Sequence, residues 1–488
     1  MRYAYAVADV RSAERELMAR LPEGTLMQRA AFGLATIAAG LLRGEAGSVY
    51  GSRVALLVGV GDNGGDALYA GALLAGRGVT VHAVLADPAR AHADGLIALR
   101  EAGGRVVLAH EAEPVLLRAD LIMDGLLGIG GSGGLRGTFA ELAALAHSAA
   151  QVSGAPMVAV DLPSGVDADT GEVAGAAVQA DVTVTFGTHK PGLLLDPGAG
   201  NAGVIEFVDI GLEFPPSVAP VLENLQEEDV RVLLPEPARS SHKYSRGVVG
   251  LAVGSERYPG AALLSVGAAL RSGVGAVRYS GPVDVVRAHP EAITGEGRVQ
   301  AWVVGSGLGQ DDEARRRLHE VLETDVPVVV DADGLRMLPQ KALDRSAPTI
   351  LTPHSGEAAH LLGVTAAEIE GRRLESVRRL AELYDATVLL KGTLTLICDP
   401  PNTTVNARAF STARVNTHAS PVLATAGSGD VLAGLIGGLL AGGLSAYDAA
   451  SVGAYVHGAA GLLAARSGPV AAGDLVATLP LAWQNIQE

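Results

Sequence analysis

The stretch RVALLVGVGDNGGDALYA, residues 53–70, decides the fold of the N-terminal half of this chain. Residues 53–60 form an apolar run, which is typical of a strand buried on both faces of a parallel sheet. A glycine-rich loop and an apolar helix around residues 68–75 follow it, and a second apolar strand begins at Val79. This strand–helix–strand order predicts a parallel α/β sheet.

The glycine-rich segment GVGDNGGD, residues 59–66, lies where a phosphate group could bind. It leads into a helix, and the first N–H groups of a helix attract anions. A tight turn with positive φ would use the same glycines, so the loop alone is a weak indication. The polar residues Asn63 and Asp66 favour a binding site.

Acidic residues close two further candidate strands, at 121–124 and 158–161. Asp124 begins DGLLGIGGSGG and Asp161 lies in VAVDLPSGVDADTG. Ligands of α/β sheets bind at the carboxyl ends of the strands, so these loops are expected to converge with residues 59–66. Carboxylates that meet raise each other's pKa unless a cation or hydrogen bonds intervene. The pattern therefore predicts an acid/base residue or a site for a hard cation.

Lys190 follows another candidate strand, within TFGTHKPG at residues 185–192. It could orient a phosphate or take part in proton transfer. A surface lysine in a Pro-Gly turn is the open alternative. Apolar runs at 182–186 and 204–208 continue the alternation and complete a predicted doubly wound sheet.

In the C-terminal half, ATAGSGDVLAGLIGGLLAGG at residues 424–443 carries the strongest signal. Its GSGD segment opens a helix whose N–H groups could neutralise a transferring phosphoryl group. Asp430, in the first turn, could accept a proton from a substrate hydroxyl. An ordinary acidic residue at a helix N-terminus is the alternative. Lys391 ends a candidate strand and His354 precedes a helix, and both could face the same cleft.

Length and composition limit the possible classes of protein. At 488 residues the chain is too long for one core, and the Pro- and Glu-rich text at 216–238 suggests a boundary between domains at 1–215 and 239–488. A net charge of −16 argues against nucleic acid as a partner. The single cysteine, Cys398, and the absence of an apolar leader favour the cytoplasm. The uncharged run Val431–Tyr447 reads as a buried helix rather than a membrane span.

The motifs of the N-terminal half, in this order, resemble the NAD(P)H-hydrate epimerase family. The resemblance implies a Rossmann-like domain that interconverts the two C6 epimers of hydrated NADH and NADPH. It implies an acid/base role for Asp161 and, more weakly, a catalytic role for Lys190. It also implies a potassium ion held by Asn63, Asp124 and Ser164. Substrate contacts are implied for Asp161 and for two segments: Asp62, Asn63, Gly64, Gly65 and Asp66, and Gly128, Ile129, Gly130, Gly131, Ser132, Gly133 and Gly134. The sequence departs from the usual family pattern at Asp62, Ala67 and Ile129.

The C-terminal motifs, together with WVVGSGLGQ at 302–310, resemble the ribokinase-like fold and, within it, ADP-dependent NAD(P)H-hydrate dehydratases. The resemblance implies that a phosphoryl group from ADP or ATP, with magnesium, activates the C6 hydroxyl, and that phosphate then leaves. Asp430 would be the base. Nucleotide contacts are implied for Lys391, Gly392, Thr393, Leu394, Thr395 and Gly429, and substrate contacts for Ala261, Gly307, His354 and Asp430.

Two alternatives remain at this stage. The C-terminal half could be an ordinary small-molecule kinase, because GSGD also serves hydroxyl phosphorylation. The N-terminal half could be a module that binds a dinucleotide without chemistry. The fusion favours repair of both epimers by one chain, with hydrated NADH or NADPH and ADP or ATP as its ligands and no membrane partner. The family resemblance also suggests a homo-oligomer.

Overall fold

The computed structural model describes residues 1–131, 133–295, 297–401, 411–418 and 421–488. The chain forms two compact units, Tyr3–Val221 and Leu222–Glu488, and Met1–Arg2 group with the second. The division falls within the predicted boundary segment 216–238. Part of that segment is regular structure of the second unit: strand β9 (Leu222–Asn224) and helix α8 (Glu227–Leu233).

The first unit is built on a seven-stranded parallel sheet in the order β4-β3-β2-β5-β6-β7-β8. This confirms the predicted doubly wound α/β fold. Successive strands extend the sheet outward from β2 in one direction and from β5 in the other, so the topological switch point lies between these two strands. The strands are β2 (Arg53–Val58), β3 (Thr80–Leu85), β4 (Arg105–Leu108), β5 (Leu121–Gly125), β6 (Met157–Val160), β7 (Val182–Phe186) and β8 (Val204–Val208).

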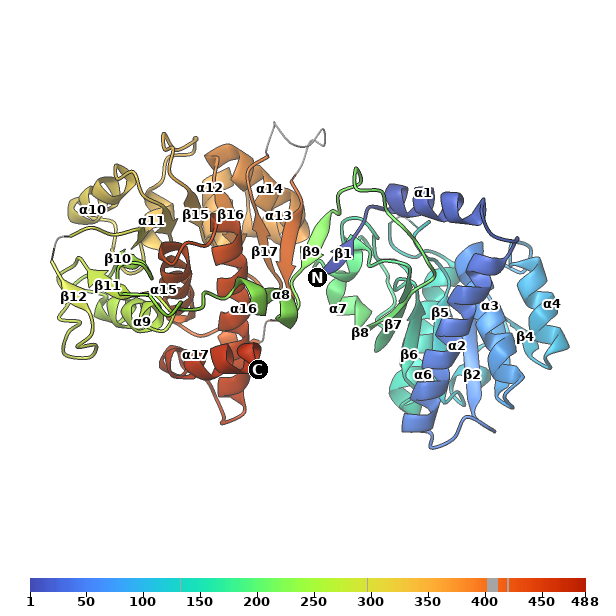
Figure 1. Cartoon of the computed structure of the whole chain (residues 1–488). Helices are drawn as coiled ribbons and strands as arrows, with labels where there is room; N and C mark the ends of the chain where they lie inside the picture. Colours follow the sequence, from blue (N-terminus) through green and yellow to red (C-terminus); the bar gives the residue numbers. More distant parts are fainter. Residues whose placement is uncertain (132, 296, 402–410, 419–420) are drawn as a thin grey trace. The chain divides into compact units, whose positions relative to one another are not determined.

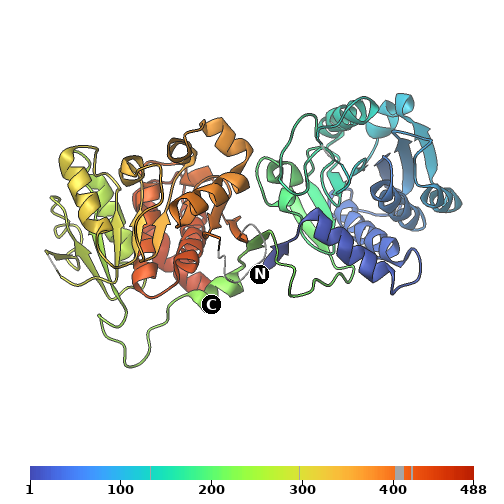
Figure 2. The ribbon, with the colours of Figure 1, turned by 90° about the horizontal axis from the view of Figure 1, so that it is seen from above.

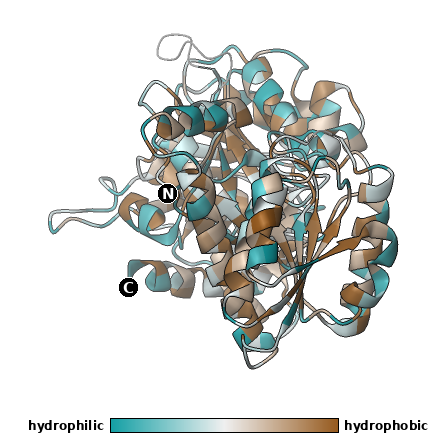
Figure 3. Cartoon of the chain, turned by 90° about the vertical axis from the view of Figure 1, so that its right-hand side faces the viewer, coloured by the Kyte–Doolittle hydropathy of each residue, from teal (hydrophilic) through white to brown (hydrophobic). Residues whose placement is uncertain are grey.

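Helices cover both faces of this sheet (Figures 1 and 2). Apolar residues of α2 and α3 pack on one face and those of α5 and α6 on the other. Figure 3 shows the strands of this unit in brown, whereas the helices carry teal residues as well. The helices are α1 (Val7–Met18), α2 (Thr25–Glu45), α3 (Asp62–Ala75), α4 (Ala93–Glu101), α5 (Glu113–Leu116), α6 (Thr138–Ser153) and α7 (Ala199–Ala202), with 3-10 turns η1 (Ala109–Glu111) and η2 (Pro191–Leu193).

The opening of the chain, before β2, is mainly helical. It forms two helices, α1 and α2, because Pro22 and Gly24 separate them and Gly24 has φ 77°. Among the described residues, α2 alone is long and apolar enough to cross a membrane by length and composition. Its face with Leu34, Ala38 and Leu42 is buried in the core cluster of the first unit, as in the core helix of a globular protein.

The second unit contains an eleven-stranded sheet in the order β1-β9-β18-β17-β16-β15-β14-β13-β10-β11-β12. It is parallel from β12 through β16, and β17 is antiparallel to both of its neighbours. Its switch point lies between β10 and β13. The strands are β1 (Arg2–Ala4), β10 (Val248–Ala252), β11 (Ala276–Tyr279), β12 (Ile293–Thr294), β13 (Ala301–Val304), β14 (Val328–Val330), β15 (Thr349–Leu351), β16 (Thr387–Leu390), β17 (Thr395–Cys398) and β18 (Ala413–Asn416), besides β9.

Closely packed small residues mark the helical core of the second unit. A Cβ on Gly434 of α15 would lie 2.2 Å from the carbonyl oxygen of Ser265 on α9, so the two helices can approach only because this residue is glycine. The run Val431–Tyr447 is thus largely a buried helix, as predicted. The remaining helices are α9 (Pro259–Ala269), α10 (Asp312–Leu322), α11 (Asp333–Met337), α12 (Ser355–Leu362), α13 (Ala366–Gly371), α14 (Arg373–Tyr384), α15 (Ser428–Ala441), α16 (Ala446–Ala465) and α17 (Ala472–Gln487), with 3-10 turn η3 (Pro421–Leu423).

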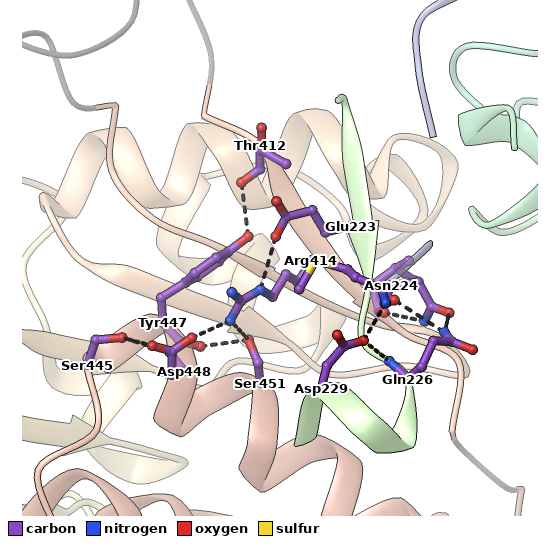
Figure 4. A network of polar contacts seen from close by, with 12 residues as sticks. Glu223, Asn224, Gln226, Asp229, Thr412, Arg414, Ser445, Tyr447, Asp448 and Ser451 are labelled. Carbon is purple, nitrogen blue, oxygen red and sulfur yellow. Dashed lines mark hydrogen bonds and ion pairs between the residues drawn. The ribbon is translucent and has the colours of Figure 1, made fainter. Parts of the chain in front are cut away.

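A polar network around Arg414 connects strand β9 to helix α16 (Figure 4). Arg414 of β18 lies 3.2 Å from Glu223 of β9 and 2.6 Å from Asp448 of α16. Its guanidinium also covers the ring of Tyr447 at 4.2 Å. Because one guanidinium satisfies carboxylates from a strand and a helix, it fixes β9 against the rest of the sheet.

Candidate active sites

The site of the first unit lies at the switch point between β2 and β5. Helix α3 begins at Asp62, so Asp62–Asp66 form its first turns rather than the predicted loop. Gly61, with φ 75°, makes the preceding turn. A Cβ on Gly59 would lie 1.8 Å from the Leu126 carbonyl oxygen, so only glycine lets this turn pack against the end of β5.

Asp161 and Lys190 form a buried ion pair at the ends of β6 and β7. Lys190 is 1% exposed, so the structure excludes the surface-lysine alternative. Its Nζ also donates to Thr185 Oγ1 at 3.1 Å and to the Phe186 carbonyl at 2.9 Å. Asp161 accepts from the Phe186 N–H at 3.2 Å and adopts φ 65°, a strained conformation for this residue type. Both charged groups are held in one orientation.

Asp124 and Ser164 are in direct contact beside this pair. Ser164 donates from Oγ to Asp124 Oδ1 at 2.7 Å and from its N–H to Oδ2 at 2.9 Å. Burial raises the pKa of Asp124 to about 6, although these bonds and the Leu126 N–H counteract it. Its hydrogen-bond donors among the described residues are all neutral groups, and a cation would stabilise its charged form.

Asn63 supplies the third candidate ligand. It lies against the same segment, because a Cβ on Gly128 would be 2.8 Å from Asn63 Oδ1. Its Nδ2 is buried without a hydrogen-bond partner in the described part of the chain, which leaves this donor for an acceptor atom of a ligand, and only the amide oxygen could bind a cation. Carboxylate, hydroxyl and amide oxygens fit a hard cation such as potassium.

The second glycine-rich segment closes the site from the β5 side. Gly131 N–H donates to the Gly128 carbonyl at 2.9 Å, which makes a tight turn. Ile129 is partly buried and its carbonyl accepts from Arg11 at 3.5 Å. Further members are packed glycines or lie outside the described residues: Gly64 against Gly59, Gly65 against His92, Gly130 near Arg11, Gly133 with φ 71°, Gly134 against Gly175, and Ser132, which is not among the described residues.

Two more carboxyl groups belong to this site. Burial raises the pKa of Asp66 well above its ordinary value, and Asp161, Asp62 and Glu14 raise it further. Glu14, on α1, was not predicted. It comes from a helix without a recognisable motif, and its nearest clue in the sequence is only a partly apolar periodicity. Besides the Asp161–Lys190 pair, the site therefore contains three carboxyl groups with raised pKa: Asp66, Glu14 and Asp124.

The site of the second unit centres on Asp430, in the first turn of α15. Burial raises its pKa to about 6; Asp331 adds to this, and Lys391 and the Ser306 hydroxyl oppose it. Ser265 Oγ donates to the Asp430 carbonyl at 3.0 Å and holds the turn in place. The carboxyl group is thus poised to accept a proton near neutral pH.

Lys391 and Asp331 form an ion pair beside Asp430. Lys391 Nζ lies 2.9 Å from Asp331 Oδ1 and 3.8 Å from Glu357 Oε2. Burial lowers the pKa of Lys391, but these two carboxylates outweigh burial and raise it. A Cβ on Gly429 would lie 3.4 Å from Lys391 Nζ. The ammonium therefore faces the N-terminus of α15, where phosphate would lie.

The predicted nucleotide segment is held from behind by Arg373 of α14. This guanidinium is 3% exposed and donates to the carbonyls of Leu390, Lys391 and Leu394 at 3.2, 3.1 and 3.0 Å. A Cβ on Gly392 would clash with it. The remaining residues of this segment become less exposed along the chain. Gly392 and Thr393 are exposed, Leu394 is intermediate, and Thr395 is buried in β17.

The predicted substrate residues lie in two places. Gly307, after β13, packs against Ala261 and Tyr258, beside a cavity of about 960 Å³ lined in part by Tyr258 and Leu308. This cavity lies at the switch point. Ser306, which precedes Gly307, contacts Asp430 through its hydroxyl. His354 caps α12 through Nδ1, which accepts from Gly356 N–H at 2.9 Å. The backbone N–H of His354 donates to the Glu357 carboxylate, which lies 3.8 Å from Lys391 Nζ. His354 is therefore close to Lys391.

Asp331, Glu357 and Arg373 were not among the predicted site residues. Asp331 follows β14, so the rule that selected Asp124 and Asp161 could have selected it too. His457 was also missed: it is buried, it contacts Ser428 at 3.2 Å, and burial lowers its pKa to about 4. Arg373 has no sequence signal, because the three carbonyls that it binds come in the chain only after α14.

Comparison with known proteins finds a family match for each half of the chain. Residues 23–192 match the family described as YjeF-related protein N-terminus, and residues 249–481 match that described as NAD(P)H-hydrate dehydratase. The bifunctional NAD(P)H-hydrate repair enzyme of Mycobacterium leprae is 47% identical over 480 residues, covering 96% of each chain. The protein of that name from Corynebacterium glutamicum is 36% identical, covering 90% of this chain and 87% of the relative.

Among solved structures, the ADP/ATP-dependent NAD(P)H-hydrate dehydratase of Bacillus subtilis, co-crystallised with ATP and Mg²⁺, is 31% identical to this chain. It aligns with a TM-score of 0.49 over 54% of this chain and 97% of its own. The full-length relatives are the stronger finding, because the match to them spans both units. The chain belongs to the family of bifunctional NAD(P)H-hydrate repair enzymes.

Proposed function

We propose that this chain repairs hydrated NADH and NADPH in two steps, one in each unit. The first unit interconverts the R and S forms at C6, and the second dehydrates the S form at the expense of ADP or ATP. The observation that supports the proposal best is the grouping of Asp430, Lys391 and Asp331 at the N-terminus of α15. This grouping suits phosphoryl transfer to a hydroxyl.

In the dehydration, Asp430 takes the proton of the C6 hydroxyl as its oxygen attacks the terminal phosphorus of the nucleotide. The bond to the nucleotide's bridging oxygen breaks, and Lys391 with the α15 N–H groups binds the charge that develops. Phosphate then leaves C6 with its electron pair, and the loss of a proton from C5 restores the dihydronicotinamide. Hydroxide is a poor leaving group, whereas phosphate is a good one.

In the epimerisation, the Asp161–Lys190 pair would exchange a proton with the C6 hydroxyl. The dinucleotide's phosphates would lie against the N-terminus of α3 and the segment 128–134, because the first N–H groups of a helix attract anions and glycine lets a ligand approach the backbone closely. A module that binds without chemistry would not need a buried ion pair aimed at its ligand. We therefore assign catalysis rather than binding alone to this unit.

Two cations complete the proposal. Potassium would be held by Asn63, Asp124 and Ser164, whose oxygens suit it, and would fix the loops that carry the substrate. Among the described residues, no group of three His, Cys, Asp or Glu side chains is arranged to hold a metal ion. Magnesium would therefore bind mainly through the nucleotide's phosphates, whose charge it neutralises, with few ligands from the chain.

The proposal extends to the location and assembly of the protein. Cys398 is buried, and burial raises the pKa of its thiol to about 12, so this side chain is protected from oxidation. Such a cysteine is compatible with the cytoplasm. The homo-oligomer that the family resemblance implied stays a prediction.

The test mixes the purified protein with both epimers of hydrated NADH, magnesium, and ADP or ATP, and follows the recovery of NADH absorbance. Complete recovery supports both activities. Recovery of one epimer's share alone would contradict the epimerase assignment. No recovery, with a stable phosphorylated product, would contradict the dehydratase assignment and favour a small-molecule kinase.

A further inference from the structure

We propose that Glu14, on helix α1, is a second acid–base group of the epimerase site, working together with the Asp161–Lys190 pair. The inference rests on the epimerase activity proposed above and deepens it. Neither the motifs nor the relatives' names assign a role to this residue.

Three contacts fasten α1 and its preceding residues to the loops of the site. Tyr5 N–H donates to the His189 carbonyl at 3.2 Å, next to Lys190. Val7 N–H donates to Asp169 Oδ1 at 2.7 Å, in the loop that follows Asp161. Arg11 reaches the Ile129 carbonyl at 3.5 Å, in the second glycine-rich segment. These contacts attach α1 to three of the segments that carry the site.

The orientation of α1 turns Glu14 towards the site. Val10 and Ala13 are buried, so this face of the helix packs inward, and Glu14 is half-buried beside them. Glu16, two residues further on, is exposed. The two glutamates lie on different faces of the helix, so Glu16 is a matched control.

Charged groups from four segments interact electrostatically with Glu14. Arg11 lies on its own helix, Asp62 on α3, Asp161 after β6 and Lys190 before η2. Burial raises the pKa of Glu14; Asp161 and Asp62 raise it further, whereas Lys190 and Arg11 lower it. Asp66 of α3 interacts with Glu14 in turn. Glu14 thus belongs electrostatically to the same group of side chains as the ion pair.

The chemistry of epimerisation explains why a second group is needed. C6 carries a hydroxyl and is bonded to N1, so protonation of the hydroxyl lets water leave with the C–O electron pair while the N1 lone pair forms a C=N bond. Water then adds to the opposite face of the ring and loses a proton. One group must donate a proton where water leaves and another must accept one where water adds, and the reverse reaction exchanges their roles. No oxidant or reductant is consumed.

Asp161–Lys190 can serve one of these positions but not both, because its carboxylate is held by Lys190 and the Phe186 N–H in a single orientation. Glu14 comes from a separate helix, and burial raises the pKa of its carboxyl group. It supplies the second position. A merely structural role would be to keep Arg11 and α1 in place, and the experiment separates the two.

The experiment measures the interconversion of the purified R and S epimers of hydrated NADH, without nucleotide, from pH 5 to 9. Wild type is compared with Glu14→Gln, Glu14→Asp and the control Glu16→Gln. We expect Glu14→Gln to slow epimerisation by about 10²-fold or more and to remove one limb of the pH profile. Glu14→Asp should restore part of the rate with a shifted limb, and Glu16→Gln should behave as wild type.

Dehydration of the S epimer in the same preparations, with ADP or ATP and magnesium, checks that each variant is folded and active in its second unit. An unchanged pH profile in Glu14→Gln would overturn the inference, as would an equal loss in Glu16→Gln. A wild-type protein that dehydrates the S epimer but never converts R to S would instead overturn the proposed epimerase function, and the inference with it.

Discussion

The ammonium of Lys391 lies 2.9 Å from Oδ1 of Asp331, and Oδ2 of the same carboxylate accepts from Ser306 at 3.0 Å. Asp331 thus binds the lysine next to the proposed base, Asp430. Its negative charge also raises the pKa of Asp430, after the larger effect of burial. One carboxylate therefore influences both the phosphate-binding cation and the acid–base group.

Replacement of Asp331 by Asn should shift the pH dependence of dehydration. Asp430 must be ionised to accept a proton, so the rate falls as the pH falls through its pKa, about 6. Without the neighbouring charge this pKa drops, and the acidic limb of kcat moves to lower pH. The maximal rate should also decrease, because Lys391 loses its partner.

The pH profile of kcat with saturating ADP or ATP measures this shift. Glu375→Gln, at an exposed position on α14, is the control for loss of one negative charge in the same unit. An acidic limb at the wild-type pH in Asp331→Asn would contradict the assignment of Asp430 as the base.

The two activities should be separable by single substitutions. We expect Asp430→Asn to lower dehydration by about 10²- to 10⁴-fold and to leave epimerisation unchanged, and Asp161→Asn to do the reverse. Each side chain keeps its size, so packing is retained while the proton acceptor is lost. Chromatographic separation of the two epimers, with and without nucleotide, measures both rates. Loss of both activities in either variant would show a folding defect instead.

Arg373 should control nucleotide binding from outside the site. Its guanidinium is bonded to three carbonyls of the segment that carries Lys391, so Arg373→Lys keeps the charge and loses the planar set of donors. Carbonyls left unpaired in the interior destabilise the unit by about 1–3 kcal/mol. We expect a lower Tm and a KM for ADP or ATP raised by about tenfold. The exposed Arg372→Lys, on the adjacent residue, should change neither value.

The parts of this structure that follow local rules could be predicted from the sequence. The strands at 182–186 and 204–208 have the predicted bounds, since a buried parallel strand is a continuous apolar run between turn residues. The predicted helix around residues 68–75 begins later than α3, which starts at Asp62. Glycines at 64 and 65 disfavour a helix in isolation, so the sequence does not indicate these first turns. Packing against Gly59 and His92 stabilises the helix there.

The candidate sites show the same limit. Asp161, Lys190 and Asp430 stand beside glycines at strand or helix ends, where the pattern itself marks them. Asp331 acts through Lys391, 60 residues later, and Glu14 acts through a helix that precedes the sheet. Contacts of this range depend on how the elements are packed, and no local spacing records them.

Potassium should stabilise the first unit. The buried carboxylate of Asp124 accepts hydrogen bonds from neutral groups of Ser164 and Leu126, so a potassium ion that binds it only in the folded state raises the stability of the unit. We expect a gain of about 1–3 kcal/mol at saturating potassium, and less with sodium or a large organic cation at equal ionic strength. Differential scanning calorimetry measures this gain as a rise in the unfolding temperature of the first unit, whichever of the two thermal transitions belongs to that unit. Asp124→Asn should remove the difference between the salts, whereas Asp120→Asn should not.

His457 should make the second unit less stable in mild acid. Burial lowers its pKa from an ordinary 6.5 to about 4, so between these values the unfolded chain binds a proton that the folded unit does not. Stability is therefore unaffected above pH 6.5 and falls as the pH drops to about 4, by on the order of 3 kcal/mol in total. Asp430 works in the opposite sense, because its raised pKa lets the folded unit take up a proton first. The comparison of wild type with His457→Gln by urea unfolding from pH 4.5 to 8 isolates the histidine: the variant should lose less stability than wild type towards acid, while equal slopes would mean that His457 is charged in the folded unit.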